Sequence, residues 1–77
     1  MAREQRIEIL AEMVANVLVV EVAVGDAVAA GDTVVLLESM KMEIPVLVEH
    51  PGTVTAVKVS SGDVVQEGDV LVSLDLA

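Results

Sequence analysis

One lysine near the middle of the chain has surroundings that suggest covalent chemistry. Residues 38–43 read Glu-Ser-Met-Lys-Met-Glu, so Lys41 lies between two methionines and is flanked further out by two carboxylates. Valine-rich runs on both sides of this segment predict β-strands, with a reversal of the chain between them. A primary amine on a long, unbranched stem at the tip of a hairpin can be acylated by another enzyme. We therefore take Lys41 as the candidate site of modification.

The rest of the chain offers little for catalysis. It has no cysteine, and its single histidine, His50, comes just before a turn predicted at Pro51-Gly52. Four aspartates each follow a glycine and are predicted to serve turns and solvation, because a calcium site needs denser oxygen ligands in one loop: Asp26, Asp32, Asp63 and Asp69. Without a nucleophile–base pair or a phosphate-binding glycine loop, we expect no catalytic residue and no metal site.

The composition describes an acidic β protein. Of the 77 residues 55% are hydrophobic and none is aromatic, and valine, the commonest residue, suits a pleated sheet better than a helix. The net charge of −9 repels nucleic-acid phosphates; it either keeps the surface solvated or steers the protein toward basic partner surfaces. The apolar runs are far shorter than the roughly 20 residues that span a membrane, and no signal peptide is visible. We expect a cytoplasmic protein that binds neither nucleic acid nor membrane.

An internal repeat divides the chain into two similar halves. Residues 17–38 align with residues 54–75 without a gap, and each half contains Gly-Asp, four further residues and a second Gly-Asp. These pairs predict turns, because glycine reaches positive φ and aspartate can bond the local backbone. We expect positive φ at Gly31 and at its repeat partner Gly68. Two β halves that each bury one face should pack sheet on sheet about a pseudo-two-fold axis.

The predicted strands follow the valine-rich runs. They lie near residues 7–10, 17–24, 33–38, 42–48, 53–59 and 70–74, with short strands at 27–28 and 64–65. Alternation of apolar and polar residues, clearest at 20–24 and 70–76, indicates half-buried antiparallel strands. Pro45 predicts a sheet edge or a bulge, since proline cannot donate to a strand ladder. The first dozen residues could instead begin with a helical turn.

Residues 38–43, at the junction of two β halves, resemble the attachment site of the biotinyl domains, which are the biotin carrier modules of biotin-dependent carboxylases. The resemblance extends from about residue 7 to residue 76. It implies an all-β fold, a flattened barrel or sandwich of two four-stranded antiparallel sheets, formed by residues 1–77 as one domain. It also implies that the hairpin which carries the lysine is exposed and remote from both termini.

Carried over residue by residue, Lys41 is the lysine that becomes amide-linked to biotin. Met40 and Met42 are the recognition residues beside it, and Glu38 matches the family's acidic position in the strand before the site. Ser39, also in the recognition segment, stands where alanine is commonest. A free lysine amine is almost fully protonated at neutral pH, so attachment requires a biotin protein ligase that supplies an activated acyl group.

Other positions match the family or depart from it outside the attachment site. Gly31 matches a glycine in the turn before the site, and Pro51-Gly52 matches the turn that opens the second half. Glu12, Val14 and Ala15 replace the proline and glycine usual in the family's Ala-Pro-Met-x-Gly segment. The first turn is therefore expected to differ in shape from that of the family, while the attachment site is unaffected. No insertion resembles the protruding thumb of some bacterial carriers, so the resemblance is to the thumbless type.

The resemblance implies a carrier function. A biotin carboxylase, dependent on ATP, carboxylates the biotin on Lys41, and a carboxyltransferase passes the carboxyl group to an acyl-CoA, as in fatty acid metabolism, or to a keto acid. Because no linker flanks the predicted strands, we expect a free-standing carrier, monomeric when free; a domain trimmed from a longer subunit is the alternative.

Two other functions fit the same fold. A lipoyl domain shares the hairpin lysine but usually presents it as Asp-Lys-Ala, whereas both neighbours of Lys41 are methionine. An unmodified structural adaptor would keep the Gly-Asp turns but would have no reason to keep Met-Lys-Met at the tip.

Overall fold

The computed structural model describes residues 5–76, which form eight β-strands and no helix. The strands are β1 (Arg6–Leu10), β2 (Ala15–Val20), β3 (Ala27–Val28), β4 (Thr33–Ser39), β5 (Met42–Leu47), β6 (Gly52–Val57), β7 (Val64–Val65) and β8 (Val70–Leu76). They form two four-stranded antiparallel sheets with the orders β1-β8-β6-β3 and β5-β4-β2-β7. This confirms the predicted all-β fold. Residues 5–76 contain no helix that is long and apolar enough to cross a membrane.

Each sheet takes two strands from each half of the repeat. Exchanging β1 with β5, β2 with β6, β3 with β7 and β4 with β8 converts one sheet order into the other. Packing of one half on the other had implied that each half forms one sheet. The two halves are instead intertwined. The repeat also extends to β1 and β5, which share an isoleucine (Ile7 and Ile44) and a leucine (Leu10 and Leu47).

The four Gly-Asp pairs end four turns of the same construction. In the turn at residues 29–32 the amide of Asp32 donates to the carbonyl of Ala29 at 3.0 Å, and the amide of Ala29 donates to Asp32 Oδ2 at 2.9 Å. Gly31, the third residue, has a φ of 95°, as a type II turn requires. The carboxylates of the other three aspartates accept the same bond: Asp26, Asp63 and Asp69. Their predicted role in turns is confirmed, as is the positive φ of Gly31 and Gly68.

The core between the sheets consists of valine, leucine and alanine side chains. Its largest fully buried members come from strands of both halves, among them Leu37 of β4 and Leu71 of β8. Strand β8 lies between β1 and β6, and residues 71–74 are all buried. Consecutive residues point to opposite faces, so both faces of β8 are covered there, and the half-buried alternation predicted for this strand is wrong.

Several strand boundaries differ from the predicted ones. Strand β2 begins and ends earlier than predicted, at Ala15 and Val20, and β6 ends at Val57, because the chain leaves each sheet to enter the following Gly-Asp turn. The possible helical turn at the N-terminus falls partly on residues 1–4, outside the described residues, and from Arg6 onward the chain is a strand. Strand β5, which contains Pro45, lies at a sheet edge as predicted.

Candidate functional site: the Lys41 hairpin

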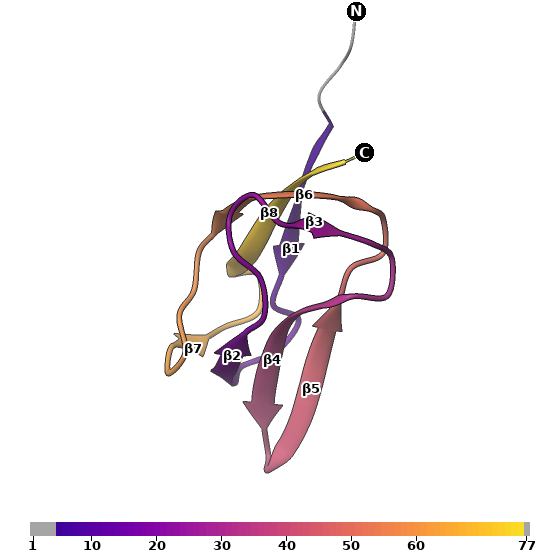
Figure 1. Cartoon of the computed structure of the whole chain (residues 1–77). Helices are drawn as coiled ribbons and strands as arrows, with labels where there is room; N and C mark the ends of the chain where they lie inside the picture. Colours follow the sequence, from indigo (N-terminus) through magenta and orange to yellow (C-terminus); the bar gives the residue numbers. More distant parts are fainter. Residues whose placement is uncertain (1–4, 77) are drawn as a thin grey trace, which may run out of the picture.

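The turn at Lys41 is topologically distinct from the other connections between the described strands. Every other connection passes from one sheet to the other, whereas β4 and β5 are consecutive and adjacent in the same sheet. Their pairing runs from Thr33↔Leu47 to Ser39↔Met42, which leaves Met40 and Lys41 as a two-residue loop. Figure 1 shows this hairpin at the end of the molecule opposite the start of β1 and the end of β8. The fold therefore projects Lys41 away from the core.

Both loop residues have left-handed backbone conformations. Met40 has a φ of 52° and Lys41 a φ of 65°, and no other non-glycine residue among those described has a positive φ. Positive φ at both central residues is the pattern of a type I′ turn, whose twist matches that of the flanking strands and which usually contains Asn-Gly. A left-handed residue other than glycine costs about 1 kcal/mol or more, and such strain clusters at functional sites. The local sequence is therefore not the one that would best stabilise this turn.

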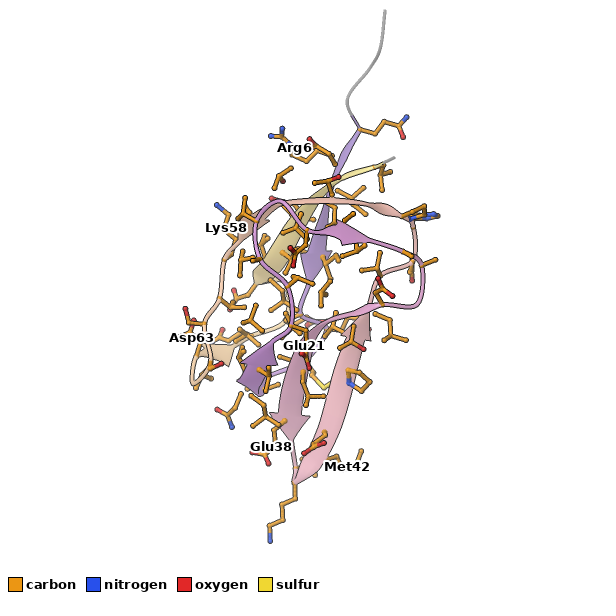
Figure 2. All side chains as sticks on the ribbon, viewed as in Figure 1. Arg6, Glu21, Glu38, Met42, Lys58 and Asp63 are labelled. Atoms are coloured by element: carbon orange, nitrogen blue, oxygen red, sulfur yellow. The ribbon has the colours of Figure 1, made fainter. Side chains whose placement is uncertain are left out.

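The side chains of the tip face solvent. Met40 is 91% exposed and Met42 is 62% exposed, so neither methionine fills the core. Lys41 is exposed as well, while Ser39, at the end of β4, is partly buried. In Figure 2 the side chains of Glu38 and Met42 lie at the hairpin end of the molecule. The tip thus presents an amine between two adaptable apolar side chains, a surface suited to contact with another protein.

The stem below the tip is acidic. Glu38 and Glu43 are direct cross-strand partners, one step from the Ser39↔Met42 pair. Like charges opposite each other on neighbouring strands destabilise a sheet. At the equivalent place in the other sheet, Arg6 and Asp75 form an ion pair with a distance of 3.1 Å between Nε and Oδ1. The stem of the Lys41 hairpin therefore lacks the charge pairing that its structural equivalent has.

No second chemical site emerges in residues 5–76. No group of three or more histidine or acidic side chains is placed to hold a metal ion in this part of the chain. His50 is exposed and lies outside the strands, in the connection that precedes β6.

Comparison with known proteins shows which family has this fold and this hairpin. Residues 7–74 match the biotin/lipoyl family, described as "Biotin-requiring enzyme". The chain belongs to this family of biotin- and lipoyl-attachment domains, which are carrier domains. A relative from Mycobacterium tuberculosis, named biotinylated protein TB7.3, is 63% identical over 38 residues. A homolog of it from Mycobacterium leprae is 60% identical over 38 residues. The alignment spans 49% of this chain and 54% of either relative, so the chain spans about half the length of the curated relatives it matches.

Solved structures include close matches to the fold. A single-chain, multi-domain long-chain acyl-CoA carboxylase matches with a TM-score of 0.89 and 28% identity, over 100% of this chain and 8% of its own. The urea carboxylase of Kluyveromyces lactis matches with a TM-score of 0.85 and 30% identity, over 96% of this chain and 6% of its own. The lipoyl domain of the 2-oxoglutarate dehydrogenase complex of Azotobacter vinelandii matches with a TM-score of 0.70 and 25% identity, over 95% of both chains. The fold is thus that of biotinyl and lipoyl domains.

Proposed function

We propose that the protein is a biotin carboxyl carrier and that Lys41 is its attachment site. The observation that carries this proposal is the exposed, strained two-residue turn that holds Lys41 at the tip of β4–β5. The other lysine within the described residues, Lys58, follows β6 and lies far from the hairpin end in Figure 2. We further propose that residues 1–77 form one domain that works in the cytoplasm.

Biotin is favoured over lipoate by the residues of the tip and by the relatives. Both neighbours of Lys41 are methionine, in contrast to the Asp-Lys-Ala usual in lipoyl domains. The relatives from Mycobacterium are named biotinylated proteins, and the two carboxylases give higher TM-scores than the lipoyl domain. An adaptor without modification would gain nothing from two left-handed residues with large side chains at an exposed tip.

In this mechanism the residues of the chain attach and present the cofactor. The Nζ atom of Lys41 would form an amide bond to the carboxyl carbon of biotin, after a biotin protein ligase has activated that carboxyl group and taken the proton from the amine. The bond to the activating group would break in the same step, and that group would leave. Bound biotin supplies a ureido nitrogen that carries carbon dioxide. Met40, Met42, Ser39 and Glu38 form the surface that the ligase, the biotin carboxylase and the carboxyltransferase contact. The rest of the domain stays outside their active sites, because the β4–β5 hairpin lies at one end of the molecule, away from the other strands (Figure 1). We propose an acyl-CoA as the final carboxyl acceptor.

The mass of the intact protein tests this proposal. The protein is produced in cells that contain biotin ligase and lipoate ligase, and its mass is compared with that of the unmodified chain. We expect the increment of one biotinyl group, located at Lys41 by fragmentation. The increment of a lipoyl group would establish the lipoyl alternative, and an unmodified chain in the presence of active biotin ligase would contradict the proposal.

The exposure of the two methionines leads to a separate prediction. Replacing both Met40 and Met42 with leucine should leave the urea unfolding midpoint nearly unchanged, since exposed substitutions alter stability by less than about 0.5 kcal/mol. Leucine is branched and less adaptable than the thioether. Loss of about 1 kcal/mol of contact energy with a partner would slow biotinylation or carboxyl transfer about fivefold.

The partly buried Met13 provides the control for this double variant. Met13→Leu makes the same chemical change at a residue packed against the core and should leave both rates unchanged. A loss of more than about 2 kcal/mol in the double variant, typical of damage to a packed core, together with normal modification, would show that the tip methionines are structural.

A further inference from the structure

A long groove runs along one flank of the sandwich, apart from the Lys41 turn. Its walls are the sheet-edge strands β1 and β5, and its volume is about 1020 Å³. Apolar side chains of both strands line it and remain half-buried although they pack against the core: Ile7, Ile9, Ile44 and Val46. Leu10 and Leu47, also in the lining, are 44% and 50% exposed. Apolar surface beside the core is therefore accessible along this flank.

The polar lining of the groove has one sign of charge. Among residues 5–76, four glutamates and no lysine or arginine line it: Glu8, Glu12, Glu49 and Glu67. A second copy of this chain, with a net charge of −9, would add repulsion at this surface. The complementary occupant combines apolar side chains with basic ones.

Among the described residues, no strand pairs with the outer edge of β1, so its backbone can accept a further strand. The amide of Leu76 donates to the carbonyl of Gln5 at 2.7 Å. In an antiparallel pair every second residue forms hydrogen bonds with the neighbouring strand, so the backbone groups of Ile7 and Ile9 bond to β8. The N–H and C=O of Glu8, between them, point away from β8 toward the outer edge. A chain laid beside β1 can form hydrogen bonds with both groups.

The equivalent edge on the other sheet is blocked. Pro45 of β5 occupies the place that Glu8 occupies in β1, because Leu36↔Pro45 is the counterpart of Glu8↔Ser73. Proline has no N–H, and it is a common means of preventing strand addition at a sheet edge. The pseudo-two-fold fold thus produces two similar edges, and at this position only the β1 edge keeps an outward-facing donor.

We propose that the β1 edge and the adjoining groove form a docking surface for an extended segment of a partner protein with alternating apolar and basic side chains. The segment adds to β1 as a further strand through the backbone of Glu8, which is a common mode of peptide recognition. Its apolar side chains contact Ile7 and Ile9, and its basic side chains lie against the glutamates. Docking there leaves the Lys41 tip uncovered and raises its effective concentration at a partner's active site. The surface goes beyond the proposed carrier function and does not depend on modification of Lys41.

A peptide titration followed by NMR tests the docking surface. The probe is the acetylated and amidated peptide Val-Lys-Val-Lys-Val-Lys-Val, added to the ¹⁵N-labelled protein. We expect chemical-shift changes along β1 and slower hydrogen exchange of the Glu8 amide. A peptide with serine in place of valine keeps the charge, and one with glutamate in place of lysine keeps the apolar side chains. Both should bind at least about tenfold more weakly.

Two variants separate docking at the β1 edge from general attraction to an acidic protein. Glu8→Pro removes the outward N–H and should abolish binding of the Val-Lys peptide; Pro45 shows that the fold accepts proline at the equivalent place. Reversing two exposed lining charges with Glu12→Lys and Glu49→Lys should weaken binding of the Val-Lys peptide and strengthen binding of the Val-Glu peptide. Lys41→Arg should bind the Val-Lys peptide as the unaltered protein does, so this result is independent of the proposed function. Unchanged binding by a folded Glu8→Pro variant, equal binding of the three peptides, or shifts confined to the hairpin tip would overturn the proposal.

Discussion

The Lys41→Arg variant should fold normally and accept no biotin. Arginine keeps the positive charge and the long stem, but it lacks the primary amine that forms the amide bond. Because residue 41 is exposed in a two-residue turn, we expect the free energy of unfolding to change by less than about 0.5 kcal/mol. A streptavidin blot after co-expression with biotin ligase should lose its signal entirely, while the urea unfolding midpoint stays in place.

Lys58→Arg is the matched control for this variant. Lys58 is also exposed, but it lies beyond the end of β6, where its backbone amide donates to the carbonyl of Leu71 at 2.9 Å. The Lys58→Arg protein should be biotinylated as fully as the unaltered protein. A blot signal that persists in Lys41→Arg and disappears in Lys58→Arg would show that Lys58 is the attachment site and would refute the assignment to Lys41.

The repeat and its turns made most of the fold predictable from sequence. Strands β3 and β7 have the predicted bounds, because each lies between two Gly-Asp turns whose chemistry is local. Which sheet each strand joins was not predictable in this way. The repeat shows that β2 and β6 are equivalent, but only the direction in which each turn sends the chain places them in opposite sheets. Burial of β8 on both faces follows from that arrangement and not from its own alternating pattern.

The position of the candidate site was predictable, but its backbone conformation was not. Residue types and the junction of the two halves single out Lys41, whereas methionine and lysine carry no preference for positive φ. Ending the predicted strand at residue 38 left three residues in the loop; strand β4 in fact reaches Ser39. A loop of two residues would have indicated a left-handed turn at once. The groove beside β1 and β5 has no signal in the sequence, because it depends on two edge strands from different sheets.

Close packing explains one of the positions that matched the family pattern. A Cβ atom on Gly52 would overlap the carbonyl oxygen of Asp75 in the neighbouring strand β8. The equivalent residue in the first half is Ala15, which is buried and does carry a Cβ. Close approach of β8 thus excludes a Cβ at position 52, whereas position 15 accommodates one.

Gly31→Val should destabilise the fold without touching the attachment site. Gly31 has a φ of 95°, and a β-branched side chain is a steric outlier at such an angle. Nothing lies within 4 Å of the place where its Cβ would be, so the cost comes from the backbone alone. We expect a loss of about 1–3 kcal/mol, measured as a lower urea midpoint. That is a large share of the roughly 5 kcal/mol or more that holds a small domain together.

The same turn supplies the control and links the loss to the hairpin. Ala30→Val places the same side chain at the preceding exposed residue, whose φ is not positive, and should change stability by less than about 0.5 kcal/mol. The amide of Gly31 donates to the carbonyl of Val48 at 2.8 Å, and the amide of Val48 donates to the carbonyl of Asp32 at 2.8 Å, so this turn anchors the chain just beyond β5. Hydrogen exchange in Gly31→Val should therefore accelerate at Val48 before it does at the buried residues of β8. Equal losses in the two variants would show that bulk, and not the left-handed backbone, governs this turn. An unchanged midpoint in Gly31→Val would show that the turn adopts another conformation in solution.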